Sequence, residues 1–301
     1  MKLSRLPIWI KAAIIAAITV LLVNVLAVTL CTVPFDGMEN SIYKGEKILV
    51  SRWSYGLRVP FSTERILSKR AKVGDILLFN NPSPSDPYRS VWRRETFIGR
   101  CVGTPGDTLM LDNEYLVTNY KKISPDMKML YSYLPSAEDT LVALIKHLGI
   151  KNNQLAGYGD KRFIRSFSVY EYYILKKYLP KDFVLEPLVK EFNRINSVHS
   201  FVIPAKGVKV DVYPWNVALM CNTILHHEKK PAYVRNDSLF VNGRYSKSYI
   251  FEDDYYWITS NNPLNTCDSR LFGFVPQSHL IGKAEYVVMS PDRGRLFKKV
   301  E

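Results

Sequence analysis

The feature that most restricts the fold of this chain is an uncharged apolar run close to its start. Residues 12–33 read AAIIAAITVLLVNVLAVTLCTV, in which Asn24 is the most polar side chain. A helix of about 20 apolar residues is long enough to cross the hydrocarbon core of a bilayer. The run therefore predicts a transmembrane helix over residues 12–33, and no comparable run follows it in the sequence.

The charges before this run predict its orientation. Lys2, Arg5 and Lys11 precede it, and positive residues concentrate on the cytoplasmic side of a membrane span. We expect residues 1–11 in the cytoplasm and the rest of the chain outside. A cleaved signal peptide has a shorter apolar segment and a small-residue cleavage site, which residues 27–29 resemble only loosely. The sequence thus favours an uncleaved, single-pass anchor.

Composition excludes several classes of protein. The 301 residues carry a formal net charge of +13, and 47% of them are hydrophobic, which indicates a folded chain. The basic residues are scattered, and neither zinc-finger spacing nor an RNP-like stretch is present. We therefore expect no nucleic-acid partner. We interpret the charge as a basic surface beside an anionic membrane.

The cysteines indicate neither a metal site nor a cofactor. No CxxC pair occurs, and no histidine stands at ligand spacing from any of the four, which are Cys31, Cys101, Cys221 and Cys267. Cys31 lies inside the apolar run, so at most one disulfide joins two of the other three. Whether that disulfide forms stays open. We predict no metal and no cofactor.

Two parts of the remaining chain read as strands. In the first part, β-type runs occupy residues 47–50, 75–79, 96–102 and 108–111. A turn is predicted at residues 104–107 (TPGD), because proline and glycine favour tight reversals. Strand runs resume at residue 201. We predict one mainly antiparallel β domain formed by residues 34–122 and 201–301.

The intervening residues 123–200 have a different pattern. Ser136 opens the stretch SAEDTLVALIKHLG, which ends at Gly149 as a natural C-cap, and Ser168 opens a second stretch of the form SVYEYYILKKYL. Both begin like a capping box, with an acidic residue three positions after the serine. We predict a helical insertion in the β domain over residues 123–200.

One segment near the end of the chain is specific enough to indicate a family. Residues 260–284 read SNNPLNTCDSRLFGFVPQSHLIGKA, which resembles the pattern GDNRxxSxDSRxxGxVPxxxIxGKA of type I signal peptidases. The residues in register are Asp268, Ser269, Arg270, Gly273, Val275, Pro276, Gly282, Lys283 and Ala284. Type I signal peptidases are proteases that use a serine nucleophile and a lysine general base.

Other segments resemble the same family in the same order. Residues 37–42 lie where the family places SMxPTL, residues 73–79 resemble its GDIVVF strand, and residues 100–107 resemble RxVGxPGD. Residues 201–207 and 240–244 also fit forms of the family. The resemblance spans nearly the whole chain outside the insertion. It implies a signal-peptidase-like β domain at the outer face of the bacterial cytoplasmic (inner) membrane.

The same resemblance places glycine at both catalytic positions. Gly37 stands where the family has its nucleophilic serine, and Gly99 where it has the lysine base. Phe35 replaces a serine that helps to stabilise the oxyanion, and Asn261 replaces the aspartate of GDN. Losing a nucleophile or base costs on the order of 10⁶ in turnover. By the family mechanism this chain should be inert.

Several residues around these positions form the predicted scaffold of the site. The resemblance implies that the site scaffold consists of Met38, Arg100, Asn261, Asp268, Ser269 and Arg270. Asp36 and Glu39 flank Gly37, and Ser41 follows it by four positions. We expect structural roles for all three. Cys101 shares a strand face with Gly99, but the sequence places no histidine or lysine to activate its thiol.

Trp53 and Tyr55 resemble the apolar surface by which family members rest on the bilayer. Aromatic side chains suit the headgroup region, because one end of the ring is apolar and the other polar. The alternative is that both rings pack internally, and the sequence leaves this open.

Three functions stay open on sequence grounds. The leading one is a non-catalytic signal-peptidase-like protein, a binding or assembly component whose partners are the cytoplasmic membrane, signal-peptide-like segments or other secretion proteins. The first alternative is an active signal peptidase I that cleaves signal peptides from secreted preproteins with non-standard catalytic residues. The second is a structural subunit with a closed groove, which filling of the groove by Phe35 would indicate.

Overall fold

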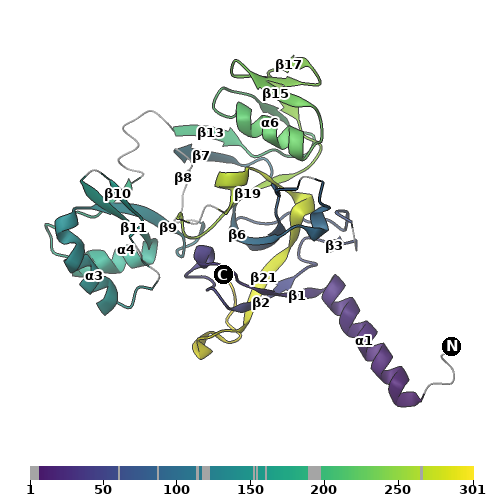
Figure 1. Ribbon diagram of the computed structural model, residues 1–301, viewed down its shortest axis with the longest axis horizontal. Coiled ribbons are helices and arrows are strands. Elements are labelled where there is room, and N and C mark those ends of the chain that lie inside the picture. The colour runs from purple at the N-terminus through teal and green to yellow at the C-terminus, as the bar shows by residue number, and fades with distance from the viewer. Residues whose placement is uncertain are drawn as a thin grey trace.

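Figure 1 shows a central β body, a helix that projects from it and a smaller lobe on the opposite side. The computed structural model describes residues 7–59, 62–86, 88–112, 115–116, 123–151, 153, 155–159, 161–188, 198–264 and 267–301. Residues 1–6, the first part of the predicted cytoplasmic segment, lie outside these ranges.

The apolar run at the start of the chain does not form a single element. Helix α1 (Ile8–Leu26) takes up its first part and strand β1 (Val28–Thr32) its second. β1 pairs with β2 (Lys47–Ser51), so its backbone groups bond to a sheet instead of continuing the helix. The predicted helix over residues 12–33 is therefore wrong at its C-terminal end. Across the described ranges, no helix combines the length and the hydropathy that crossing a membrane requires.

The main sheet has seven strands in the order β1-β2-β21-β5-β6-β19-β20, all paired antiparallel. The strands not yet introduced are β5 (Ile76–Asn80), β6 (Thr96–Gly103), β19 (Tyr255–Thr259), β20 (Val275–Pro276) and β21 (Leu280–Met289). β21, from the end of the chain, lies between β2 and β5 (Figure 1). The prediction of a mainly antiparallel β domain is confirmed.

Both faces of this sheet are covered, as the burial of β5 shows. All five of its residues are buried, as expected for an apolar strand with packing on each side. Leu78 belongs to a core cluster with Met38 and Ile98, whereas Phe79 belongs to a different cluster with Cys101 and Ile258. Successive residues of β5 and β6 therefore face different cores.

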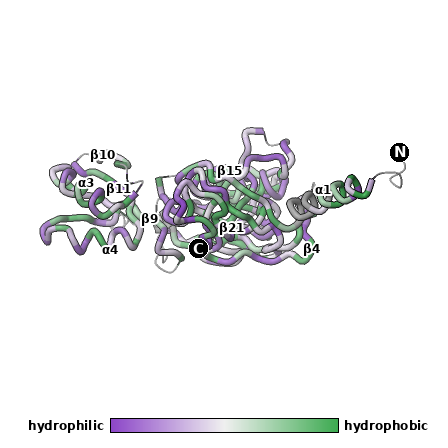
Figure 2. The backbone as a smooth tube through the Cα atoms, turned by 90° about the horizontal axis from the view of Figure 1, so that it is seen from below, coloured by the Kyte–Doolittle hydropathy of each residue, from purple (hydrophilic) through white to green (hydrophobic). Residues whose placement is uncertain are grey.

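The region predicted as a helical insertion is a mixed α/β lobe. Its sheet has the strand order β10-β11-β9-β12. Its elements are β9 (Lys128–Tyr133), α3 (Glu138–His147), β10 (Gly157–Gly159), β11 (Arg162–Ser168), α4 (Val169–Tyr178) and β12 (Glu186–Pro187). The lobe has a core cluster of its own and is set apart from the body (Figure 2). The helical prediction failed because β9 and β11 pair across α3, and local patterns do not reveal such pairing.

The predicted helix ends of the lobe are partly confirmed. Ser168 forms a capping box with Glu171 at the start of α4. Ser136 does not cap α3: it lies in the 3-10 turn η4 (Pro135–Ala137), and the N-cap Ala137 offers no side-chain acceptor. Gly149 follows α3 with φ +67°, the left-handed conformation that suits glycine after a helix.

Smaller elements surround the main sheet. They are β3 (Leu57–Arg58), β4 (Arg65–Ile66), η3 (Val91–Arg93), β7 (Thr108–Asp112), β8 (Tyr115–Leu116), β13 (Val198–Val202), β14 (Lys209–Asp211), α6 (Val217–His226), β15 (Ala232–Arg235), β16 (Ser238–Val241), β17 (Arg244–Ser246), β18 (Ser248–Ile250), α7 (Ser269–Phe272), η5 (Gln277–His279) and η6 (Arg293–Arg295). Sequence analysis missed α6. Its buried residues Val217, Met220, Cys221 and Ile224 have the helical spacing that indicates an amphipathic helix.

Candidate functional site

The predicted nucleophile position lies in a 3-10 turn that follows β1. Gly37 is the middle residue of η2 (Asp36–Met38) and is buried. Its carbonyl accepts a hydrogen bond from the backbone N–H of Asn262 at 2.9 Å. Met38 packs in the core with Ile98 of β6, which places the turn beside that strand.

The predicted base position lies inside β6, where Gly99 is opposite Leu77 of β5. A Cβ atom at Gly99 would come within 2.6 Å of Ile258 Cγ2 and 3.3 Å of the Thr259 carbonyl oxygen. Both distances are shorter than an ordinary van der Waals contact. The space that a side chain at position 99 needs is therefore occupied by β19, and Ile258 is fully buried there.

A small pocket lies beside Gly37. Its volume is about 20 Å³, close to the smallest space that holds one water molecule. It is lined by Val33, Pro34, Phe35, Gly37, Met38, Phe97, Ile98, Ser260 and Cys267. This lining offers a hydroxyl and a thiol but no amine or imidazole to accept their protons. Phe35 is 57% exposed, so its ring faces solvent more than it fills the pocket.

A buried hydrogen-bond network surrounds Ser41. The Arg100 guanidinium donates to Ser41 Oγ at 2.7 Å and to Asn261 Oδ1 at 3.0 Å. Asn261 Nδ2 donates to Ser41 Oγ at 3.0 Å and to the Glu39 carbonyl at 3.1 Å. Ser41 in turn donates to Asp126 Oδ2 at 2.6 Å. Burial lowers the pKa of Arg100 to about 10, against the opposing effect of the Asp126 carboxylate. The Ser41 hydroxyl therefore has a structural role, because its donor and acceptor positions are used within this network.

The other predicted scaffold residues hold the loop that carries Asn261. Asp268 and Arg270 form a buried ion pair at 2.6 Å. Asp268 also accepts a hydrogen bond from the Ser260 N–H at 2.8 Å, and Ser269 Oγ accepts one from the Ile258 N–H at 2.9 Å. The structure thus brings all the scaffold residues to the region of η2 and β6.

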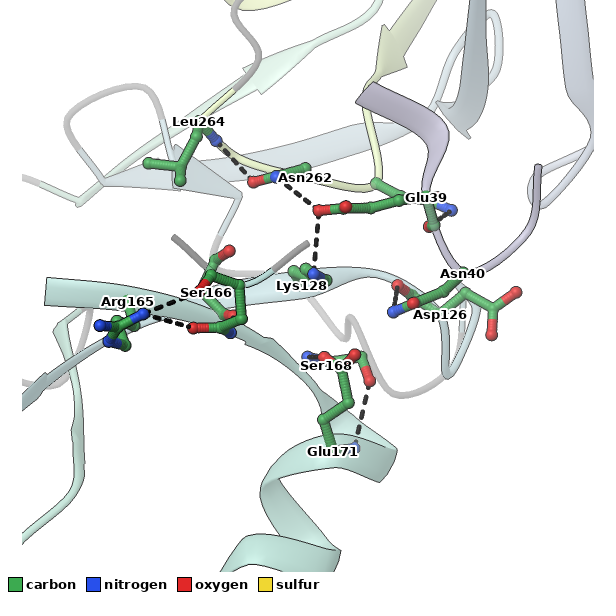
Figure 3. Close-up of polar contacts among 12 residues, drawn as sticks. Glu39, Asn40, Asp126, Lys128, Arg165, Ser166, Ser168, Glu171, Asn262 and Leu264 are labelled. Carbon is green, nitrogen blue, oxygen red and sulfur yellow. Dashed lines mark hydrogen bonds and ion pairs between the residues drawn. The ribbon is translucent and has the colours of Figure 1, made fainter. Parts of the chain in front are cut away.

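Sequence analysis missed Lys128 as part of this region. Its Nζ lies 2.9 Å from Glu39 Oε1, and both side chains are almost wholly buried. Asn262 Nδ2 donates to the same carboxylate oxygen at 2.6 Å (Figure 3). The pair ties the turn at Gly37 to β9, the first strand of the lobe. No local pattern marks Lys128, because its partner lies far earlier in the sequence.

The remaining candidate groups are not arranged to act as a nucleophile or a general base. Cys101 is fully buried, and burial, reinforced by the charge of Asp75, raises the pKa of its thiol. Asp36 is exposed and Glu39 is held by Lys128. In the part of the chain that the structure describes, no group of three His, Cys, Asp or Glu side chains is arranged to hold a metal ion.

Of the two aromatic residues predicted to face the membrane, only Trp53 is exposed. Trp53 is 60% exposed, but Tyr55 is only 3% exposed. Tyr55 Oη donates to Asp75 Oδ2 at 2.9 Å, and its ring packs with Leu77. The assignment of Tyr55 to a membrane surface is therefore wrong, because a core hydrogen bond holds this ring inside.

Comparison with known proteins points to one family. A family model described as "Signal peptidase, peptidase S26" matches residues 6–167 and 204–289. Signal peptidase I of Buchnera aphidicola subsp. Baizongia pistaciae is 25% identical over 260 residues, which cover 85% of this chain and 68% of the relative. For signal peptidase I of the subspecies Schizaphis graminum the identity is 25% over 262 residues, 86% of this chain and 67% of the relative. Signal peptidase I of Rickettsia akari is 27% identical over 124 residues, 38% of this chain and 43% of the relative.

Proposed function

The chain belongs to the signal peptidase family, peptidase S26. We propose that it is a member of this family that does not cut peptides. We propose that it acts as a binding or assembly component at the outer face of the cytoplasmic membrane. The ligands that we propose are extended, signal-peptide-like segments.

The observation that supports loss of catalysis is the packing at Gly99. A serine–lysine dyad requires an amine beside the hydroxyl that it activates. Here Ile258 Cγ2 occupies the space that a side chain on Gly99 would enter. The nearby Lys128 amine is held by Glu39 instead.

The edge of the main sheet supports a retained binding role. β1 is the terminal strand of the seven, and it leads directly into the turn at Gly37. Leu30 in this strand is 59% exposed. An extended peptide added to a sheet edge is held by main-chain hydrogen bonds and side-chain pockets, and neither requires the dyad.

Helix α1 supports attachment to a membrane. It projects away from the β body (Figure 2), and Ile8, Trp9 and Ile15 are 85%, 72% and 64% exposed. Covering such apolar surface contributes about 25 cal/mol per Å². We expect the full chain to stay with the membrane pellet during alkaline carbonate extraction. Release into the supernatant would contradict this attachment.

Catalysis is tested by cleavage of a secretory precursor with the purified, detergent-solubilised protein. Three forms are compared: wild type, Gly37→Ser/Gly99→Lys, and the same double variant with Ile258→Met. Methionine conserves volume and has no branch at Cβ, so the triple variant gives the new lysine room. We expect no cleavage by wild type and the strongest cleavage by the triple variant.

Each result has a separate meaning. Cleavage by the triple variant would show that the protein still binds precursors and lacks only the dyad and the space for its lysine. If all forms are silent, a labelled signal peptide that also fails to bind wild type would favour a structural subunit over a peptide-binding one. Cleavage by wild type that disappears in Cys267→Ser or Ser260→Ala would overturn the proposal.

A further inference from the structure

A second and larger cavity lies near the point where α1 meets the sheet. Its volume is about 280 Å³. Its lining includes Leu30 of β1, Asn80 of β5 and Thr96 of β6, together with Arg52, Arg58 and Trp92. None of these residues lines the pocket at Gly37. Because β1, β5 and β6 all contribute to one cavity, the sheet curls around it. We call it the arginine cavity, after Arg52 and Arg58.

Arg58 is buried in the wall of this cavity with part of its hydrogen-bonding capacity unused. It is 8% exposed. Its Nε donates to the Ser62 carbonyl at 3.0 Å and its Nη1 to Asn80 Oδ1 at 2.9 Å. Among the described residues, neither Arg58 Nη2 nor Arg52 Nε has an acceptor. A buried donor without an acceptor is costly, and more so when it carries charge.

The positive charge here is concentrated and not balanced. Arg65 stands directly opposite Arg58 in the β3–β4 pair, and like charges at such positions destabilise the pairing. Its Nε also has no acceptor in the described chain. No Asp or Glu of the described ranges forms an ion pair with Arg52, Arg58 or Arg65.

The titration of these groups reflects the same imbalance. Burial, and in second place the charge of Arg52, lower the pKa of Arg58 to about 10. Burial also lowers the pKa of Arg65 to about 10, with Arg58 and Arg52 acting in the same direction. Buried charges in folded proteins are ordinarily paired. Arg52 and Arg58, the two arginines that line the cavity, therefore fit a site whose anion comes from outside the chain.

The shape and surroundings of the cavity favour a phosphate group as this anion. A guanidinium presents a planar fork of donors that matches phosphate oxygens. The volume of about 280 Å³ leaves room for more than the phosphate itself. Leu30 and Trp92 add apolar surface at the lining and are 59% and 38% exposed. The β1 residues of the lining lie a few positions after the last residue of α1, Leu26.

We propose that the arginine cavity is a binding site for a phosphate group, held by Arg52 and Arg58. The phosphate is carried by an anionic phospholipid headgroup or taken up as the free ion. The site itself does not depend on the proposed loss of catalysis. The lipid source rests on the proposed membrane attachment through α1.

The test is thermal unfolding of the detergent-solubilised full chain with defined probes. Inorganic phosphate is titrated in the low millimolar range against sodium chloride of equal ionic strength. A ligand that binds the folded state raises Tm in a saturable way, by about 4 °C at a hundredfold excess over Kd for a chain of this size. We expect this rise in wild type.

Matched variants locate the effect. Arg52→Gln/Arg58→Gln removes both charges, and we expect it to lose the phosphate-dependent rise while its Tm without phosphate does not fall. Arg244→Gln makes the same chemical change at an exposed position outside the cavity and should behave as wild type. If the double variant does not fold, Arg58→Lys keeps the charge without the fork and should weaken phosphate binding about tenfold by calorimetry.

The source of the phosphate is separated by a second pair of probes. Dihexanoyl phosphatidylglycerol is compared with zwitterionic dihexanoyl phosphatidylcholine on the same proteins. A larger, arginine-dependent rise with phosphatidylglycerol than with free phosphate identifies a lipid headgroup, and the reverse identifies the free ion. The proposal is overturned if neither probe exceeds the chloride control, if the double variant responds like wild type, or if an acidic peptide alone stabilises the protein.

Discussion

Asn261 shows how single side chains now organise the site. Its amide accepts from Arg100 and donates to the Glu39 carbonyl and to Ser41. A carboxylate has no proton to donate to a carbonyl. An asparagine at position 261 therefore serves this network in a way that an ionised aspartate would not.

Removing this amide should destabilise the protein. Asn261→Ala leaves Arg100 Nε without its acceptor in a buried position, which costs about 2–4 kcal/mol. Urea unfolding measures the loss. Asn222→Ala, at an exposed position of α6, is the matched control and should cost under about 0.5 kcal/mol. Equal losses in the two variants would contradict the role of the network.

The cysteines should differ sharply in reactivity. Cys267 is exposed, whereas Cys101 is buried with a raised thiol pKa, and the thiolate is the reactive form. A maleimide reagent at neutral pH should label Cys267 in the folded protein and Cys101 only after denaturation. Mass spectrometry of digested samples assigns the labels, and Cys267→Ser should remove the fast phase. Fast labelling of Cys101 would refute its burial.

At the scale of elements, the link between η2 and β9 joins the body to the lobe. Glu39 directly follows η2, and Lys128 is the first residue of β9. Both charges are removed from water, so each depends on the other for compensation. A lobe that is otherwise separate in its core is thereby fixed against the segment that carries Gly37.

Removing one charge of this ion pair should lower the stability of the protein strongly, whereas removing both charges should not. Lys128→Met leaves Glu39 charged and buried, which should cost about 3–5 kcal/mol. In Lys128→Met/Glu39→Gln the charge is gone and the glutamine can still accept from Asn262, so most of the stability should return. Chemical denaturation of wild type, Lys128→Met, Glu39→Gln and the double variant gives the coupling energy. A double variant as unstable as Lys128→Met would show that the charge is not the cause.

At the scale of the whole molecule, histidines from two separate elements meet in the body. His227 is the C-cap residue of α6, and His279 lies in η5 just before β21. Their rings are 5.5 Å apart. Burial lowers the pKa of His227 to about 3 and that of His279 well below its ordinary value, and Arg94 adds to both shifts. Arg94 Nη1 also lies 3.2 Å from His279 Nε2, which suits a neutral imidazole that accepts a hydrogen bond.

This pair should make the protein sensitive to acid. Below about pH 6.5 the unfolded chain binds protons at these histidines and the folded chain does not, so stability falls as the pH falls from about 6.5 toward 3. The slope is up to about 1.4 kcal/mol per pH unit for each histidine. Urea midpoints between pH 7 and pH 5 measure it.

The control for this slope is a histidine remote from the pair. His227→Gln/His279→Gln should flatten the dependence on pH, whereas His147→Gln, at an exposed position of α3, should leave it unchanged. An unchanged slope in the double variant would assign the acid sensitivity to the carboxylates instead.

The sequence by itself determined the features that contiguous residues carry. The strand runs of β2, β5 and β6 appear in the structure within a residue or so of their predicted bounds. The motif at residues 260–284 indicated the family, and the separate resemblances at residues 37–42 and 100–107 predict that Gly37 and Gly99 stand at the catalytic positions. The capping box at Ser168 was also readable, because its two partners lie three residues apart.

Tertiary structure alone decided the features that depend on distant partners. Pairing with β2 divided the apolar run and made Val28–Thr32 a strand. Pairing of β9 with β11 made the insertion a mixed lobe, and a hydrogen bond to Asp75 drew Tyr55 into the core. The Lys128–Glu39 pair and the arginine cavity likewise join segments far apart in the chain. In each case the free energy comes from burial or pairing with a remote segment, and this is why local patterns did not contain it.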